Sequence, residues 1–115
     1  MGTMTMLFGG EPGPTTRYAC SDTAQNLSAI YNNSSSRPAI GAIVTAEVGD
    51  VRFTLGGALA STYPPTQGAS GLGHILYEGQ SIQLGSGPAV RTFQFLSHTN
   101  GASATIQVTP LFEKG

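Results

Sequence analysis

The stretch that decides the fold is residues 71–112, GLGHILYEGQSIQLGSGPAVRTFQFLSHTNGASATIQVTPLF. Apolar residues recur at every second position along it, which predicts short antiparallel strands with one buried face. The residues expected on that face are Ile75, Tyr77, Ile82, Leu84, Phe93, Phe95, Ala104, Ile106 and Val108. Asn100-Gly101 tolerates the positive φ angles of a tight turn, so we expect it to join the last two strands as a hairpin.

The preceding part of the chain continues the same pattern. Val51, Phe53 and Leu55 alternate with polar residues and are expected to point inward, with a turn at Gly49-Asp50 before them. Strands are therefore predicted at 39–47, 50–56, 72–78, 80–85, 89–97 and 102–111, with one or two more within 4–8 and 16–31. Helical periodicity is nearly absent. The fold class that follows is all-β: a single-domain antiparallel β-sandwich or jelly-roll-like barrel.

The N-terminal residues have a different composition from the predicted strands. Residues 1–16 combine Gly and Pro, which favour neither a helix nor a central strand, so we expect an extended N-terminal arm followed by a β-sandwich domain at 17–115. Such an arm is either frayed or laid on a neighbouring subunit, where its apolar residues would be buried. These residues are Met4, Met6, Leu7 and Phe8. In 16–31, a helical turn capped by Ser21 or Asp22 and an interrupted strand fit equally well.

Charge is scarce in this chain. Charged residues make up 10% of it and the formal net charge is -1. The surface is then either suited to packing against other subunits or merely rich in hydroxyl groups. The five Lys and Arg residues are scattered, which argues against nucleic acid as a partner. No apolar run reaches the length of a membrane span and the N-terminus lacks a secretory pattern, so we expect no membrane contact and synthesis in a cytoplasm.

Residue types that carry chemistry are few and separated. His74 and His98 with Glu78 could form an acid-base or metal site, but structural histidines are the simpler interpretation, and a cupin-like metal set is missing. Glu47 and Asp50 could pair as catalytic carboxylates, although the turn that follows a strand explains both. The Gly-rich stretches lack the Lys and the helix of a phosphate loop, and the lone Cys20 has no partner for a disulfide. We therefore expect no enzyme activity, no cofactor and no metal.

Contact residues are a separate question. The loop at 58–73 is the longest irregular connection, and its Tyr63, Pro64 and Pro65 are candidates for protein contacts. Arg52 and Arg91 are expected on the outer faces of strands, as interface residues or as solubilising charges.

From Ala39 onward the predicted strands and turns follow one another in a definite order. The segments are 50–53 (DVRF), the Gly-Gly and Pro-containing loop 56–68, 73–76 (GHIL), the turn 78–80, 81–84 (SIQL), 89–96 and 102–108. This order, in its strand spacing and turn residues and over about two-thirds of the chain, resembles a group of small structural proteins from the virions of tailed bacteriophages.

The resemblance implies a non-enzymatic virion protein, most of all a capsid decoration or cement protein. It would bind the major capsid protein on the capsid surface as a homo-oligomer, with a trimer favoured. A head-tail or tail component of the virion is the alternative within the same class. A carbohydrate-binding β-sandwich module is an alternative from another class, although the chain has no Trp and four Tyr to stack on sugars.

Overall fold

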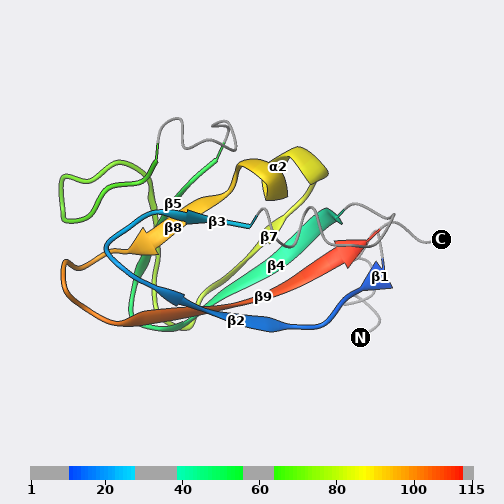
Figure 1. Ribbon diagram of the computed structural model, residues 1–115, viewed down its shortest axis with the longest axis horizontal. Coiled ribbons are helices and arrows are strands. Elements are labelled where there is room, and N and C mark those ends of the chain that lie inside the picture. The colour runs from blue at the N-terminus through cyan, green and yellow to red at the C-terminus, as the bar shows by residue number, and fades with distance from the viewer. Residues whose placement is uncertain (1–10, 28–38, 56–63, 113–115) are drawn as a thin grey trace.

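The computed structural model describes residues 11–27, 39–55 and 64–112, and Figure 1 draws them as a β-sandwich. In chain order the elements are β1 (Glu11–Pro12), β2 (Thr16–Cys20), β3 (Gln25–Asn26), β4 (Ala39–Val48), β5 (Val51–Thr54), β6 (His74–Leu76), β7 (Ser81–Leu84), α2 (Gly87–Thr92), β8 (Gln94–Ser97) and β9 (Ala104–Phe112). The predicted all-β, single-domain antiparallel sandwich is confirmed.

The strands form two antiparallel sheets. In the first, sheet A, β1 and β2 pair with one side of β9, β4 with its other side, and β7 with β4. In the second, sheet B, the order is β3-β8-β5-β6. The long β4–β9 ladder runs from the Ala39–Phe112 pair to the Val48–Thr105 pair and forms the centre of sheet A.

Successive strands cross from one sheet to the other at one end of the sandwich, the left end of Figure 1. The β2–β3, β4–β5, β6–β7 and β8–β9 connections all do so. The predicted hairpin at Asn100-Gly101 is therefore wrong. Gly101 has the positive φ expected of a turn, 77°, but β8 belongs to sheet B and β9 to sheet A. Crossing lets the apolar faces of consecutive strands pack against each other, which an isolated hairpin cannot do.

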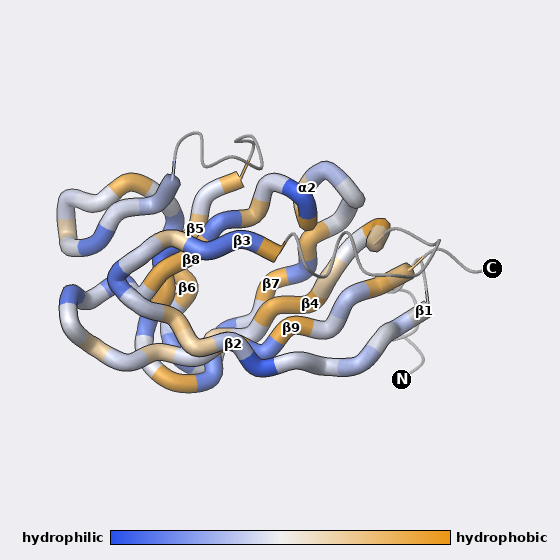
Figure 2. The backbone as a smooth tube through the Cα atoms, in the orientation of Figure 1, coloured by the Kyte–Doolittle hydropathy of each residue, from blue (hydrophilic) through white to orange (hydrophobic). Residues whose placement is uncertain are grey.

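The core lies between the two sheets and contains the predicted phenylalanines Phe53, Phe93 and Phe95. The ring of Phe93 lies 5.4 Å from that of Phe53 and 5.6 Å from that of Phe95, and Tyr18 meets Phe95 edge-on at 6.1 Å. Alternate residues of β9 contribute Ala104, Ile106 and Val108. Figure 2 shows the hydrophobic segments on the central strands, whereas β3 at the edge of sheet B is hydrophilic.

The helix α2 occupies part of the strand predicted at 89–97, which is an error of the sequence interpretation. Ser86 is its N-cap, and its hydroxyl accepts a hydrogen bond from the Ala89 N–H at 3.2 Å. Val90 points into the core and is fully buried. Strand geometry begins only at Gln94, so β8 is shorter than predicted.

Around β6 the alternation runs in the opposite phase to the prediction. Leu76 is buried, Ile75 is half-buried, and Tyr77, which was expected inside, is 52% exposed. Leu55, also expected inside, is 45% exposed just beyond the end of β5. With three residues, β6 is too short for alternation to decide which side faces the core.

The residues 11–16, the described end of the expected arm, run along β9. β1 pairs with Leu111 and Phe112, and the Gly13 N–H donates to the Pro110 carbonyl at 2.8 Å. The Thr15 hydroxyl is hydrogen-bonded to that of Thr109. This segment therefore adds to the edge of sheet A. Residues 1–10 lie outside the described part of the chain.

The two central strands of sheet B are buried on both faces. All four residues of β5 and all four of β8 are buried. Val51, Phe53 and Phe95 belong to the core between the sheets, but Arg52 and Leu96 point the other way and are only 6% and 4% exposed. Another part of the chain must therefore cover the outer face of sheet B.

Candidate functional site

The segment Pro64–Gly73 lies on the outer face of sheet B and is called the covering loop below. Its backbone is hydrogen-bonded to the residue that follows β8 and to other residues of the same loop. The Gly68 N–H donates to the His98 carbonyl at 2.9 Å, and the Thr66 N–H donates to the Leu72 carbonyl at 3.0 Å. The Thr66 hydroxyl in turn accepts from the Leu72 N–H at 2.6 Å. These bonds make the loop a folded part of the sandwich and not a free connection.

Arg52 fastens the covering loop to the sheet. Its guanidinium donates to the carbonyl oxygens of Gly68 at 2.8 Å, Ala69 at 3.4 Å and Gly73. Its Nε lies 3.3 Å from Nδ1 of His98. The prediction of a surface arginine is thus corrected: Arg52 does point outward from β5, but the loop covers it and its donors are used within the chain.

Gln67 is a second attachment point that the sequence did not indicate. Its side-chain amide donates to the carboxylate of Asp22 at 2.8 Å and to both the carbonyl and the hydroxyl of Ser97 at 3.0 Å. The Asp22 carboxylate also accepts from the Gly101 N–H at 3.0 Å. Hydrogen bonds from Gln67 and then from Gly101 lower the pKa of Asp22 below its usual value, because they favour the ionised form. Asp22 therefore joins three separate segments at the corner end of the sandwich.

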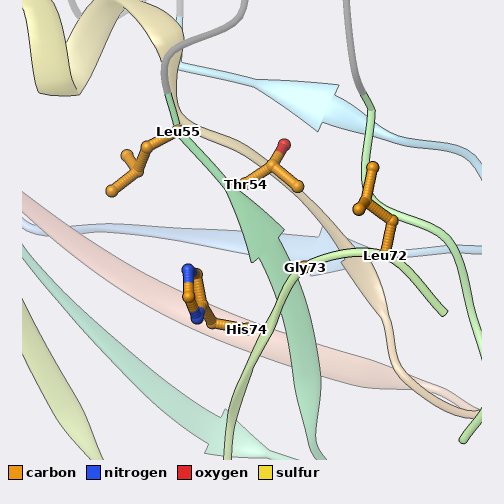
Figure 3. Close-up of a pocket in the computed structure, with 5 residues that line it drawn as sticks. All are labelled: Thr54, Leu55, Leu72, Gly73 and His74. Carbon is orange, nitrogen blue, oxygen red and sulfur yellow. The ribbon is translucent and has the colours of Figure 1, made fainter. Parts of the chain in front are cut away.

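A shallow hollow of about 370 Å³ opens beside the covering loop. Figure 3 shows its lining: Thr54 and Leu55 at the end of β5, and Leu72, Gly73 and His74 where the loop enters β6. Leu55 and Leu72 are about half exposed there, at 45% and 52%. The His74 ring lies 5.5 Å from that of Phe53, so this histidine packs against an aromatic ring as a structural residue.

The outer face of sheet A is not covered by any described segment, and it differs from that of sheet B. Outward side chains align in rows across β2, β9, β4 and β7, because the register places them opposite one another. One row contains Arg17, Gln107, Thr45 and Ser81, and the next contains Thr109, Ile43 and Gln83. The Thr45 and Ser81 hydroxyls are 2.6 Å apart. This surface, the sheet A face, is lined mainly by hydroxyl and amide groups.

One ion pair supplies the charges of the sheet A face. Arg17 Nε donates to one oxygen of Glu47 at 2.6 Å and Nη2 to the other at 2.8 Å. The Thr105 hydroxyl donates to the same carboxylate at 3.2 Å. The hydrogen bond from Arg17 is the main reason that the pKa of Glu47 lies below its usual value, and its counterpart raises the pKa of Arg17. The two charges cancel on this face.

The structure describes only part of the set of residues predicted for protein contacts. Met4, Met6, Leu7, Phe8 and Tyr63 lie outside the described part of the chain. Pro64 is half-buried and Pro65 is buried in the covering loop. Arg91 is exposed, but it lies in α2 and not on a strand as predicted.

The groups considered for chemistry make other contacts. His74 packs on Phe53 and His98 is bonded to Arg52. Cys20 is buried, and burial raises the pKa of its thiol to about 11. Within residues 11–27, 39–55 and 64–112, no three His, Cys, Asp or Glu side chains come together to hold a metal ion. The same residues contain no helix long and apolar enough to span a bilayer.

Neither the sheet A face nor the position of the covering loop could be predicted from the types of individual residues in the sequence. Both depend on which strands pair and on which segment lies over each sheet. Comparison with protein-family models, curated proteins and solved structures gives no significant match to this chain.

Proposed function

We propose that this chain is a non-enzymatic structural protein of a virus particle, a capsid decoration protein that contacts its neighbours through the sheet A face. The partners in this proposal are the major capsid protein and further copies of the chain, with a trimer as the expected assembly. The protein would then be located on the capsid surface.

The strand order supports the proposal at the level of architecture. Sheet A reads β2-β9-β4-β7 and sheet B reads β3-β8-β5-β6, and the β2–β3, β4–β5, β6–β7 and β8–β9 connections cross between the sheets. We interpret this order as that of an eight-stranded jelly roll, in which β1 extends β2 at the edge. Jelly rolls occur in viral capsid proteins, and also in lectins and cupins, so architecture alone does not choose among them.

The observation that carries the proposal is the chemistry of the sheet A face. Its hydroxyls are already hydrogen-bonded to each other, as in the Thr45–Ser81 pair, and its ion pair is internally neutral. A partner can cover such a face without removing water from an unpaired charge, which is the main cost of burying a polar surface. The low charge of the whole chain, 10% of residues, suits a protein that works in a packed array.

The proposed mechanism is mass action. A protein that binds only the assembled shell stabilises it in proportion to occupancy, because binding lowers the free energy of the assembled state alone. Many weak copies of one flat contact are enough for this purpose, since their contributions add over the lattice.

The test is binding to assembled capsids of the phage that encodes the chain, by co-sedimentation, with the oligomeric state measured in parallel by light scattering. Ile43→Lys places an unpaired charge in the middle of the sheet A face at a half-buried outward position. Ser70→Lys places the same charge at an exposed position of the covering loop. We expect the wild type and Ser70→Lys to bind and Ile43→Lys to lose binding.

The other outcomes overturn the proposal in different ways. Loss of binding with Ser70→Lys but not with Ile43→Lys would move the contact to the covering loop. No binding by a monomeric wild type would remove the decoration role. A copy number of a few per particle, measured on purified virions, would indicate a head-tail or tail component at a unique vertex.

The carbohydrate-binding alternative has one observation in its favour, the exposed ring of Tyr77. A single ring is a small stacking platform. Binding on a glycan array that Tyr77→Ala abolishes would favour this alternative, and a silent array would leave the capsid proposal in place.

A further inference from the structure

The side chain of Arg52 is buried among neutral acceptors. Four of its contacts are known: the carbonyl oxygens of Gly68, Ala69 and Gly73, and Nδ1 of His98. A guanidinium can only donate hydrogen bonds, so the ring nitrogen that faces it must carry a lone pair and no proton. The geometry therefore selects the neutral form of His98 with its proton on Nε2.

His98 also holds the backbone at this point. Its N–H donates to the Asp50 carbonyl at 2.9 Å, and its carbonyl accepts from the Gly68 N–H at 2.9 Å. The residue thus links the start of β5 to the covering loop, and its side chain meets the arginine that fastens the same loop. A change in the charge of this ring acts directly on the attachment of the loop.

The acidic groups around this corner are engaged elsewhere. Asp22 accepts from Gln67 and Gly101, one oxygen of Asp50 accepts from the Glu78 N–H at 2.9 Å, and Glu78 accepts from the Gly49 N–H at 3.4 Å. In the described segments, the only ion pair at salt-bridge distance is Arg17–Glu47, so no carboxylate there is paired with Arg52. A proton added to His98 would give two cations side by side, with none of the described carboxylates in contact.

We propose that His98 is an acid-sensitive latch for the covering loop: protonation of Nδ1 removes the acceptor of Arg52, sets an imidazolium against the guanidinium, and releases residues 66–73 from sheet B. Histidine is the side chain that ordinarily changes charge between about pH 5 and 8, so the loop is held at neutral pH and loosened in mild acid. This inference concerns the chain's own conformation and does not depend on the virion role.

The test is hydrogen exchange of the Gly68 amide, whose bond to the His98 carbonyl joins the loop to the rest of the sandwich, compared at about pH 7.5 and about pH 5.5 after correction for intrinsic exchange. In the wild type we expect protection of this amide to fall by up to about tenfold in acid, the limit that uptake of one proton by a histidine freed from the arginine sets between these pH values. In His98→Asn, the amide oxygen takes the place of Nδ1 as a non-titrating acceptor, so protection should be independent of pH.

The chain has one other histidine, which provides the control. His74→Asn removes an imidazole that contacts Phe53 and should keep the wild-type pH response. Wild-type protection that does not change with pH, a response that persists in His98→Asn, or one that disappears in His74→Asn would each overturn the latch.

A second measurement needs no variant and stands if His98→Asn does not fold. The ¹⁵N shifts of the His98 ring in the wild type report which nitrogen carries the proton at neutral pH. A bare Nδ1 that gains a proton as the Gly68 amide loses protection supports the latch, and an Nδ1 already protonated at neutral pH overturns it.

Discussion

Arg17 on β2 and Glu47 on β4 form a two-pronged ion pair across the intervening strand β9, with N–O distances of 2.6 and 2.8 Å. The pair joins strands that share no backbone hydrogen bonds with each other. Because its side chains are 60% and 30% exposed, solvent screens it, and its contribution to stability is small.

Glu47→Gln should lower the stability slightly at neutral pH and not at all in strong acid. The pKa of Glu47 is lowered in the folded chain, so its stabilisation is present above the usual carboxyl pKa and disappears as the pH falls through the lower folded value. Urea unfolding of both proteins at about pH 7 and about pH 2 measures the difference. A difference that persists in acid would assign the effect to packing or neutral hydrogen bonds. High salt provides the control, because it should reduce the difference at neutral pH.

Gly73→Ala should destabilise the chain more than Gly79→Ala. Both glycines have positive φ, 116° and 88°, which costs any other residue about 1–2 kcal/mol. At Gly79 a Cβ would meet open space, but at Gly73 it would lie 2.7 Å from the Phe53 carbonyl oxygen of β5. The covering loop would have to move away from the strand. Unfolding midpoints in urea should therefore fall further for Gly73→Ala. Equal shifts for the two variants would show that the loop can move away from the Phe53 carbonyl without loss of stability.

The alternation of apolar residues predicted most of the core because burial on one face of a long strand leaves a period of two in the sequence. β9 shows this best, with Ala104, Ile106 and Val108 buried as expected. Pairing was harder to predict. The turn at Asn100-Gly101 marks a reversal of the chain, but a reversal within one sheet and a crossing between two sheets have the same local turn chemistry.

The errors at the candidate sites have a similar cause. Arg52 was assigned to the surface because it alternates with Val51 and Phe53, and nothing in β5 itself shows that a distant loop covers its outer face. The helix α2 did leave a local signal, Ser86 as N-cap with Pro88 in the first turn, although the Gly-rich stretches were expected not to lead into a helix. Whether a distant loop covers a strand depends on the whole fold, whereas a helix cap can be recognised in the local sequence.

Phe95→Ala should cost about 3–5 kcal/mol, whereas Tyr77→Ala should leave the stability almost unchanged. Phe95 is fully buried and its ring contacts those of Phe93 and Tyr18. Tyr77 is 52% exposed, although the alternation in the sequence placed it inside as well. The pair of variants, compared by urea unfolding, thus tests the phase of β6. A large loss of stability with Tyr77→Ala would mean that the Tyr77 side chain points into the core, as the alternation predicted.

Cys20 should be almost unreactive in the folded protein and become reactive on unfolding. The thiolate is the nucleophile, and with a pKa of about 11 only roughly one thiol in a thousand is ionised at about pH 8. Its side chain is also enclosed in the core, at 6% exposed. A chromogenic disulfide reagent added to native and to urea-unfolded protein measures both rates.

The control for this last experiment is the destabilised Phe95→Ala variant. If modification requires transient opening of the sandwich, the rate should rise in proportion to the open population, so this variant should react faster than the wild type under native conditions. Native protein that reacts as fast as unfolded protein would place Cys20 at the surface. Equal native rates in the wild type and in Phe95→Ala would mean that the thiol is reached by local fraying of β2, where Cys20 is the last residue of an edge strand.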